Sequence, residues 1–192
     1  MISTPYFVVV VGAPGSGKDL LIRAVNDLGI QHAQIVSKHT SRERRDDDGN
    51  EMICPGDPGF NLEACDIIYE NYGDRYGIEC SRVWEWLRKG IFQVIAVSEI
   101  GAINKLHEIF GELMLLIYVH SEMSADDYER VEVAFGEDTD YVARRAKKYR
   151  KAFEVFLENY LAFDHVLIYA GAPEDLYDQI FRLFRAYERG DL

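Results

Sequence analysis

The most constraining feature of this sequence is a glycine-rich turn between a short apolar run and an amphipathic segment. The apolar run at residues 7–11 leads directly into Gly-Ala-Pro-Gly-Ser-Gly-Lys at residues 12–18, and a helical pattern over residues 18–28 follows at once. This order of strand, loop and helix is what a Walker A motif requires, because glycines let backbone N–H groups turn toward phosphates and the helix N-terminus adds its dipole. We therefore predict a phosphate loop in which Lys18 reaches the β- and γ-phosphates of ATP.

The predicted ATP-binding residues are the loop and the position after its lysine: Gly12, Ala13, Pro14, Gly15, Ser16, Gly17, Lys18 and Asp19. Asp19 stands where the motif has a Ser or Thr whose hydroxyl ligates Mg²⁺. A carboxylate is also a hard oxygen ligand, so Asp19 is a predicted metal ligand, direct or through water. Two alternatives stay open: Asp19 indicates an altered chemistry at the phosphate loop, or it is an acid in the first helical turn that only interacts favourably with the helix dipole.

Along the rest of the chain, short apolar runs alternate with longer helical patterns. The runs expected as strands buried on both faces are residues 7–11, 34–36, 92–97, 114–119 and 165–169. The expected helices are residues 18–28, 81–88, 100–110, 125–133, 141–160 and 173–187. This alternation predicts an α/β chain with a central parallel sheet, and the loop after the first strand makes it a three-layer P-loop fold.

Residues 38–78 break the alternation, because they are polar, rich in Gly, Asp and Pro, and hold only short strand-like pieces such as residues 66–69. We expect them to form an inserted acceptor-binding subdomain. The remaining residues, 1–37 and 79–192, are expected to be the core of one domain. A chain of 192 residues is long enough for one well-packed domain and too short for two ordinary ones.

Composition narrows the classes of partner. A formal net charge of −12 repels polyanions, so neither a nucleic-acid polymer nor an anionic membrane is an expected partner.

The 3 cysteines form no CxxC pair, which suits a reducing compartment, and residues 1–6 lack the basic residues of a signal peptide. No apolar stretch approaches the ~20 residues that span a bilayer. A soluble, cytoplasmic protein is expected, and its oligomeric state stays open.

With the loop placed, the chain resembles the guanylate kinase family from about Tyr6 to about Tyr187. The family's Ser-His-Thr-Thr-Arg-x-x-Arg stretch, which clamps the acceptor phosphate, is matched by Lys-His-Thr-Ser-Arg-Glu-Arg-Arg at residues 38–45. Its Gly-Asn-x-Tyr-Gly stretch is matched by Gly-Asp-Arg-Tyr-Gly at residues 73–77, and its last strand by residues 164–168. The resemblance implies that Arg42, Arg45 and Tyr76 hold the phosphate of a small phosphorylated acceptor.

The resemblance also implies a lid, in which arginines flank an acidic loop and close over the substrates. Arg130 and Arg145 keep the outer positions, so the lid is expected at residues 130–145, while Ala134 replaces the middle arginine. With Lys18, these two arginines are the expected catalytic residues. The implied activity is ATP-dependent transfer of the γ-phosphoryl group to a nucleoside monophosphate or similar acceptor, with ATP and Mg²⁺ bound.

The departures from the family cluster where guanine is read. The family's polar base contacts are replaced by Lys38, Met52, Ile67 and either Ile78 or Glu79, and its Asp-x-Asp pair becomes Ala-Val-Ser at residues 96–98. Phosphate contacts are retained and base contacts are lost, so little preference for GMP is expected. Glu99, beside the missing pair, is a candidate replacement as a metal or acceptor contact.

Two alternative functions remain open. Ribose 1,5-bisphosphate phosphokinase carries Gly-Ser-Gly-Lys-Asp at its P-loop, as residues 15–19 do here, which favours a sugar phosphate acceptor. Guanylate-kinase-like domains of scaffolding proteins bind partners without catalysis but typically lack the P-loop lysine, whereas Lys18 is present.

We expect the basic run at residues 144–151, apart from Arg145, and the acids at residues 46–48 to be solvated. His39 is expected to bond to the backbone.

Overall fold

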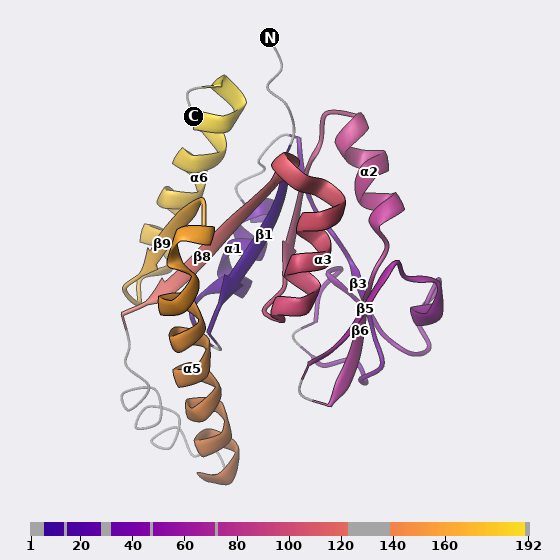
Figure 1. Ribbon diagram of the computed structural model, residues 1–192, viewed down its shortest axis with the longest axis horizontal. Helices are drawn as coiled ribbons and strands as arrows, with labels where there is room; N and C mark the ends of the chain where they lie inside the picture. Colours follow the sequence, from indigo (N-terminus) through magenta and orange to yellow (C-terminus); the bar gives the residue numbers. More distant parts are fainter. Residues whose placement is uncertain are drawn as a thin grey trace.

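A five-stranded parallel sheet forms the centre of the fold, with strand order β2-β7-β1-β8-β9 (Figure 1). The structure is a computed structural model that describes residues 6–13, 15–27, 32–46, 48–71, 73–122 and 139–190. The strands of this sheet are β1 (Phe7–Gly12), β2 (Ala33–Ile35), β7 (Phe92–Ala96), β8 (Met114–Ser121) and β9 (His165–Tyr169). All of them lie within two residues of the expected apolar runs, so the predicted parallel sheet is confirmed.

Strand β1 lies in the middle of the sheet and is buried along its whole length. Its side chains alternate between two hydrophobic cores, one containing Phe7, Val9 and Val11 and the other Val8 and Val10. Successive side chains of a strand point to opposite faces, so a continuous apolar run indicates a sheet covered on both sides.

Helices cover both faces of the sheet and complete the three layers. On one face lie α1 (Lys18–Asp27) and α6 (Pro173–Arg189), which contribute Leu21 and Ile180 among others to the second core. On the other face lie α2 (Cys80–Arg88), α3 (Ile100–Phe110) and the carboxyl-terminal half of α5 (Thr139–Asn159), with short 3₁₀ turns at Leu62–Ala64, Gly111–Leu113 and Tyr160–Ala162. The helix expected at residues 125–133 lies outside the described residues.

The inserted segment builds a second sheet of four strands, order β4-β3-β6-β5, beside the carboxyl end of the central sheet (Figure 1). Its strands are β3 (Lys38–Thr40), β4 (Met52–Ile53), β5 (Ile67–Asn71) and β6 (Asp74–Ile78). Only β5 was expected from the sequence, because β3 and β4 are too short to show an alternating pattern. Ile67 and Ile78 pair across β5 and β6 and are buried in the first core with Val9, so the two sheets share one apolar interior.

Within the described part of the chain, no helix is long and apolar enough to cross a membrane.

Candidate active site at the edge of the central sheet

The predicted phosphate loop connects β1 to α1 at the carboxyl edge of the central sheet. Gly15 and Gly17 have φ angles of 75° and 93°, a left-handed backbone that favours glycine. A Cβ atom at Gly12 would lie 2.7 Å from the carbonyl oxygen of Val119 and 2.4 Å from Ser16 Oγ, so no larger residue fits there. These positions require glycine for the loop to turn tightly at the start of α1, as the motif predicts.

The side chains of this loop are arranged around its backbone. Ser16 is 1% exposed, and its Oγ has no hydrogen-bond partner among the described residues. The Lys18 ammonium donates a 2.5 Å hydrogen bond to the carbonyl oxygen of Ala13, which holds the lysine over the loop. A buried hydroxyl without a partner is costly, and a phosphate oxygen would satisfy it. The loop therefore fits the phosphates of a nucleotide. Pro14 lies outside the described residues.

Asp19 occupies the first turn of α1 and is exposed to solvent. No three His, Cys, Asp or Glu side chains of the described residues gather as a metal site. Mg²⁺ commonly takes only one or two protein carboxylates and completes its shell with phosphates and water, so a single carboxylate here is compatible with the predicted ligand role.

Arg42, the first arginine of the expected acceptor clamp, is already paired within the chain. Its two terminal nitrogens donate to the two carboxylate oxygens of Asp48 at 2.7 and 2.5 Å, and the side chains of both residues are less than a tenth exposed. The hydrogen bond from Arg42 holds the pKa of Asp48 below its usual value. This corrects the expectation for Asp48, which is not solvated but orders the clamp.

Arg45 and Tyr76 complete the expected clamp. The backbone N–H of Arg45 donates to Asp48 at 2.8 Å, while its side chain is exposed. The Tyr76 side chain is mostly buried, stacks on Tyr69 with ring centroids 5.5 Å apart, and is one of the groups that raise the pKa of Arg42. The structure thus brings Arg42, Arg45 and Tyr76 together around Asp48, with Arg45 as the member that faces solvent.

Lys38 is a charged residue of this region whose role sequence reasoning missed, since it was considered only as the loss of a serine. It is 7% exposed, and its ammonium donates a 2.6 Å hydrogen bond to the carbonyl oxygen of Ala96 at the end of β7. Burial lowers the pKa of Lys38 to about 8, against the opposing effect of Asp19 and Glu51. The sequence gives no signal for this role, because Lys38 lies in the polar stretch Ser-Lys-His-Thr-Ser at residues 37–41.

Two of the expected base-reading positions, Ile67 and Ile78, are apolar and closed. Ile67 and Ile78 are 1% and 0% exposed within the first core, and Met52 is half-buried in β4. His39 is buried and accepts a hydrogen bond from the backbone of Asn61, as expected, and it also pairs with Glu79 at 2.6 Å. Ile67, Ile78 and Met52 therefore offer a base no hydrogen-bonding group.

Glu99 has a structural role that the sequence analysis did not anticipate. Its two carboxylate oxygens accept hydrogen bonds from the backbone N–H groups of Gly101 and Ala102 at 2.9 and 2.6 Å, so it caps the amino terminus of α3. Side-chain caps of this kind stabilise a helix by about 1 kcal/mol. Glu99 also lines the pocket beside the phosphate loop, so its role as a metal or acceptor contact stays a prediction.

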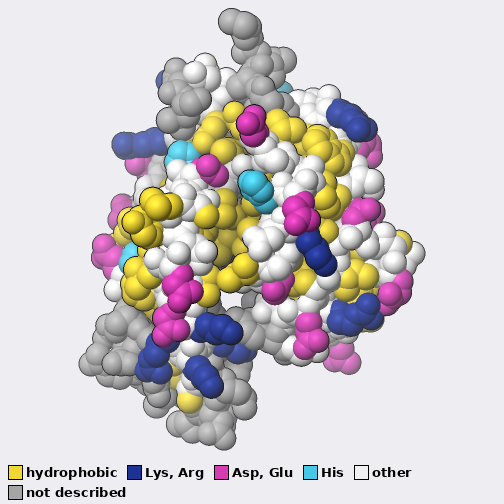
Figure 2. Space-filling view, in the orientation of Figure 1, with side chains coloured by type: hydrophobic (Ala, Val, Ile, Leu, Met, Phe, Trp, Pro, Cys, Tyr) yellow, Lys and Arg dark blue, Asp and Glu magenta, His cyan; other side chains and the backbone are white. Residues whose placement is uncertain are grey.

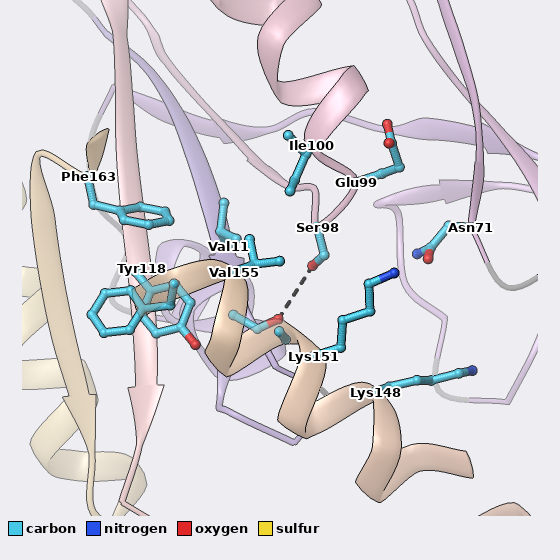
Figure 3. Close-up of a pocket in the computed structure, with 13 residues that line it drawn as sticks. Val11, Asn71, Ser98, Glu99, Ile100, Tyr118, Lys148, Lys151, Val155 and Phe163 are labelled. Carbon is cyan, nitrogen blue, oxygen red and sulfur yellow. Dashed lines mark hydrogen bonds between the residues drawn. The ribbon is translucent and has the colours of Figure 1, made fainter. Parts of the chain in front are cut away.

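A pocket of about 260 Å³ opens beside the phosphate loop, between the start of α3 and the helix α5 (Figure 3). Its apolar wall includes Val11, Tyr118, Val155, Phe156 and Phe163. Lys148 and Lys151 extend from α5 toward the side where Asn71 lies, at the end of β5 (Figure 3). Two lysines of the basic run thus line a pocket beside Gly12; Lys151 is exposed, as the sequence analysis expected, whereas Lys148 is partly buried.

Basic side chains gather over α5 on the face shown in Figure 2, beside a hollow between this helix and the insert. The pocket residues contributed by α5 include Lys148 and Lys151, and the insert contributes Asn71, whereas the clamp residues Arg42, Arg45 and Tyr76 do not line this pocket. Of the expected lid residues, Arg130 lies outside the described residues. Arg145 belongs to α5, and its side chain also lies outside the described part.

No protein-family model matches this sequence, and no curated protein matches it. Among solved structures, a guanylate kinase from Anaplasma phagocytophilum is similar, with a TM-score of 0.63 and 16% sequence identity. The match covers 98% of this chain and 89% of that chain. At this identity the likeness shows the fold alone. The chain therefore has a guanylate-kinase-like P-loop fold, and its chemistry must be argued from its own residues.

Proposed function

We propose that the protein is a phosphotransferase that moves the γ-phosphoryl group of ATP to a small phosphorylated acceptor. The observation that carries this proposal is the phosphate loop, where required glycines surround the buried Ser16 hydroxyl and Lys18 lies over the loop backbone. The basic hollow beside this loop supports an anionic acceptor, and the guanylate-kinase-like fold supports the reaction class.

In the proposed reaction, Lys18 and the loop N–H groups hold the β- and γ-phosphates and neutralise the charge that develops during transfer. The bond from the γ-phosphorus to ADP breaks as its bond to the acceptor oxygen forms, so no covalent enzyme intermediate is needed. Arg45 and Tyr76, positioned by Arg42 and Asp48, hold the acceptor's own phosphate. Mg²⁺, with Asp19 as its proposed ligand, supplies further neutralisation of phosphate charge when bound.

The acceptor is proposed not to be selected by a guanine base. Guanine offers N–H donors that would be left unpaired against Ile67 and Ile78, at a cost of about 1–3 kcal/mol each. A second candidate, a sugar bisphosphate acceptor, is favoured by one observation: Lys148 and Lys151 line a pocket beside the phosphate loop and are separate from the clamp, which suits an acceptor with two anionic groups.

The test is a comparison of kcat/KM for GMP, dGMP, AMP, UMP and ribose 1,5-bisphosphate with ATP under one set of conditions. We expect GMP to have little or no advantage over the other acceptors. A thousandfold preference for GMP, about 4 kcal/mol, would contradict the proposed acceptor site and indicate an ordinary guanylate kinase.

The competing function is a non-catalytic module that uses the hollow to bind another protein. ATP turnover that depends on Lys18 would exclude it, whereas absence of both ATP binding and turnover in the folded wild-type protein would favour it. We propose the enzyme because Lys18 and the glycines of the loop are all present.

A further inference from the structure

Lys38 lies where the insert meets the phosphate loop. It is the first residue of β3, and its side chain crosses from the insert sheet to the carbonyl oxygen of Ala96 on β7. Ala96 pairs with Val10 of β1, two residues before Gly12. The Lys38 ammonium is therefore held at the carboxyl edge of the central sheet, beside the start of the phosphate loop.

The charges around Lys38 come from both halves of the proposed active site. On the loop side, Asp19 is the strongest of the acidic groups that act on it. On the insert side are Arg42 and Asp48 of the clamp, and the ammonium lies 5.8 Å from the centre of the Tyr76 ring. The Lys38 ammonium thus lies between the phosphate loop, where ATP is proposed to bind, and the clamp, where the acceptor phosphate is proposed to bind.

The ammonium has donors left for a ligand. A lysine carries three N–H donors, and within the described part of the chain its one hydrogen bond is to Ala96. Holding a charge at this depth opposes folding, since burial disfavours the ionised form and an apolar side chain would fill the site at less cost. Because the Lys38 ammonium is buried, has unused N–H donors and lies beside the phosphate loop, binding an anion explains it better than a purely structural role does.

We propose that Lys38 contacts the transferred phosphoryl group and neutralises its charge as it passes from ATP to the acceptor. This inference rests on the proposed phosphotransferase function and adds a catalytic residue to it. Lys18 acts from the loop and Lys38 from the insert, so the phosphoryl group lies between two ammonium groups on opposite sides of the site.

The structural alternative is that Lys38 only ties the insert to β7 through Ala96. Lys38→Gln removes the charge but keeps an N–H donor for the Ala96 carbonyl, whereas Lys38→Arg keeps the charge. For a charge-neutralising role, Lys38→Gln should lower kcat about 100-fold or more, with less than a threefold change in the KM for ATP, and Lys38→Arg should keep at least a tenth of kcat. The melting temperatures of both variants should stay within a few degrees of the wild type.

A Lys38→Gln variant with kcat within threefold of the wild type would contradict the proposal, and so would a folded Lys38→Arg variant as inactive as Lys38→Gln. If Lys38→Gln does not fold, the ¹⁵Nζ resonance of Lys38, identified by its loss in Lys38→Arg, provides a second test in the wild-type protein. It should shift when a non-hydrolysable ATP analogue with Mg²⁺ is added, and an unchanged resonance would overturn the proposal. Wild-type protein that transfers no phosphoryl group would instead show that the phosphotransferase function itself is wrong.

Discussion

The phosphate loop and the acceptor clamp are proposed to bind the same chemical group, a phosphate, with different parts of the chain. The loop is made of backbone turned by glycines, and the buried Ser16 hydroxyl has no partner among the described residues. The clamp is made of side chains, and its buried arginine, Arg42, is already held by both oxygens of Asp48. The loop thus offers a ligand a neutral hydroxyl beside backbone N–H groups. In the clamp, Asp48 already binds both terminal nitrogens of Arg42, and only the buried Nε of Arg42 lacks a partner among the described residues.

This difference decides where binding energy can come from. A phosphate at the loop would replace an unsatisfied state, so each contact adds to binding. A phosphate at the clamp meets an arginine whose charge is largely neutralised by Asp48, so the exposed Arg45 has to supply most of the attraction. Substitutions in the two regions should therefore differ in effect: the phosphate loop has groups available for a phosphate, whereas the clamp arginine is already bound to Asp48.

The largest effect is expected at the loop. Lys18→Ala removes the ammonium that offsets charge on the β- and γ-phosphates, so kcat should fall about 1,000-fold or more while the circular dichroism spectrum and melting temperature stay unchanged. Lys105→Ala, an exposed lysine on α3, is the matched control and should keep full activity. Near-normal turnover by Lys18→Ala would exclude the kinase function.

At the clamp, Arg45→Ala should weaken all phosphorylated acceptors alike, because it removes a contact to the phosphate that they share. We expect KM for each acceptor to rise roughly 10- to 100-fold, as for one charge-assisted hydrogen bond, with little change in thermal stability. Steady-state kinetics with two unrelated acceptors measures this. An effect confined to one acceptor would place Arg45 outside the phosphate site.

Asp48→Asn should affect stability rather than turnover alone, because it leaves the guanidinium of Arg42 without its anionic partner. A loss of about 1–3 kcal/mol in the free energy of unfolding is expected at pH 7. Arg42 lowers the pKa of Asp48, so this stabilisation is present above the ordinary carboxyl pKa of 3.8 and is lost as pH falls through the lower folded value. Urea unfolding of both proteins from pH 7 to pH 3 should show the gap narrowing, and a constant gap would contradict the pairing.

In the pocket beside the phosphate loop, Lys151→Ala should distinguish acceptors by their number of anionic groups. A bisphosphate acceptor should lose roughly 5- to 10-fold in kcat/KM, and a monophosphate acceptor should be nearly unaffected. Lys147→Ala is the matched control, because Lys147 lies on the same helix, is exposed and does not line the pocket. Equal losses for both acceptors would indicate a general electrostatic effect of α5.

The smallest effect is expected at Asp19. Asp19→Ser introduces the hydroxyl that the motif normally places after the lysine, and Asp19→Ala removes all ligand capacity. If Asp19 binds the metal, the Mg²⁺ concentration for half-maximal activity should rise several-fold in Asp19→Ala and much less in Asp19→Ser. An identical Mg²⁺ dependence in all three proteins would leave Asp19 as a helix-terminal acid only.

The same contrast explains what could be predicted from the sequence. The central sheet and the loop were predictable, because long apolar runs and glycines at fixed spacing each impose one local conformation. The insert was predicted as a segment, but apart from β5 its strands were not, since strands as short as β4 carry no periodic signal and their pairing is decided by tertiary contacts. For the same reason the sequence showed Arg42 and Asp48 but not their pairing, and it did not show that Glu99 caps α3 or that Lys151 lines a pocket.

The apolar interior shared by the two sheets constrains how this protein can change over evolutionary time. Ile67 aligns, through the family resemblance, with a base-reading glutamate, yet here it is 1% exposed inside a core that also holds Val9 and Ile95. Returning a carboxylate to that position would bury a charge without a partner and cost several kcal/mol, a large part of the stability of an ordinary domain. A single Ile67→Glu substitution therefore cannot create a polar base contact at this position without compensation elsewhere in the core. The packing shared by the two sheets thus limits the substitutions that this interior accepts.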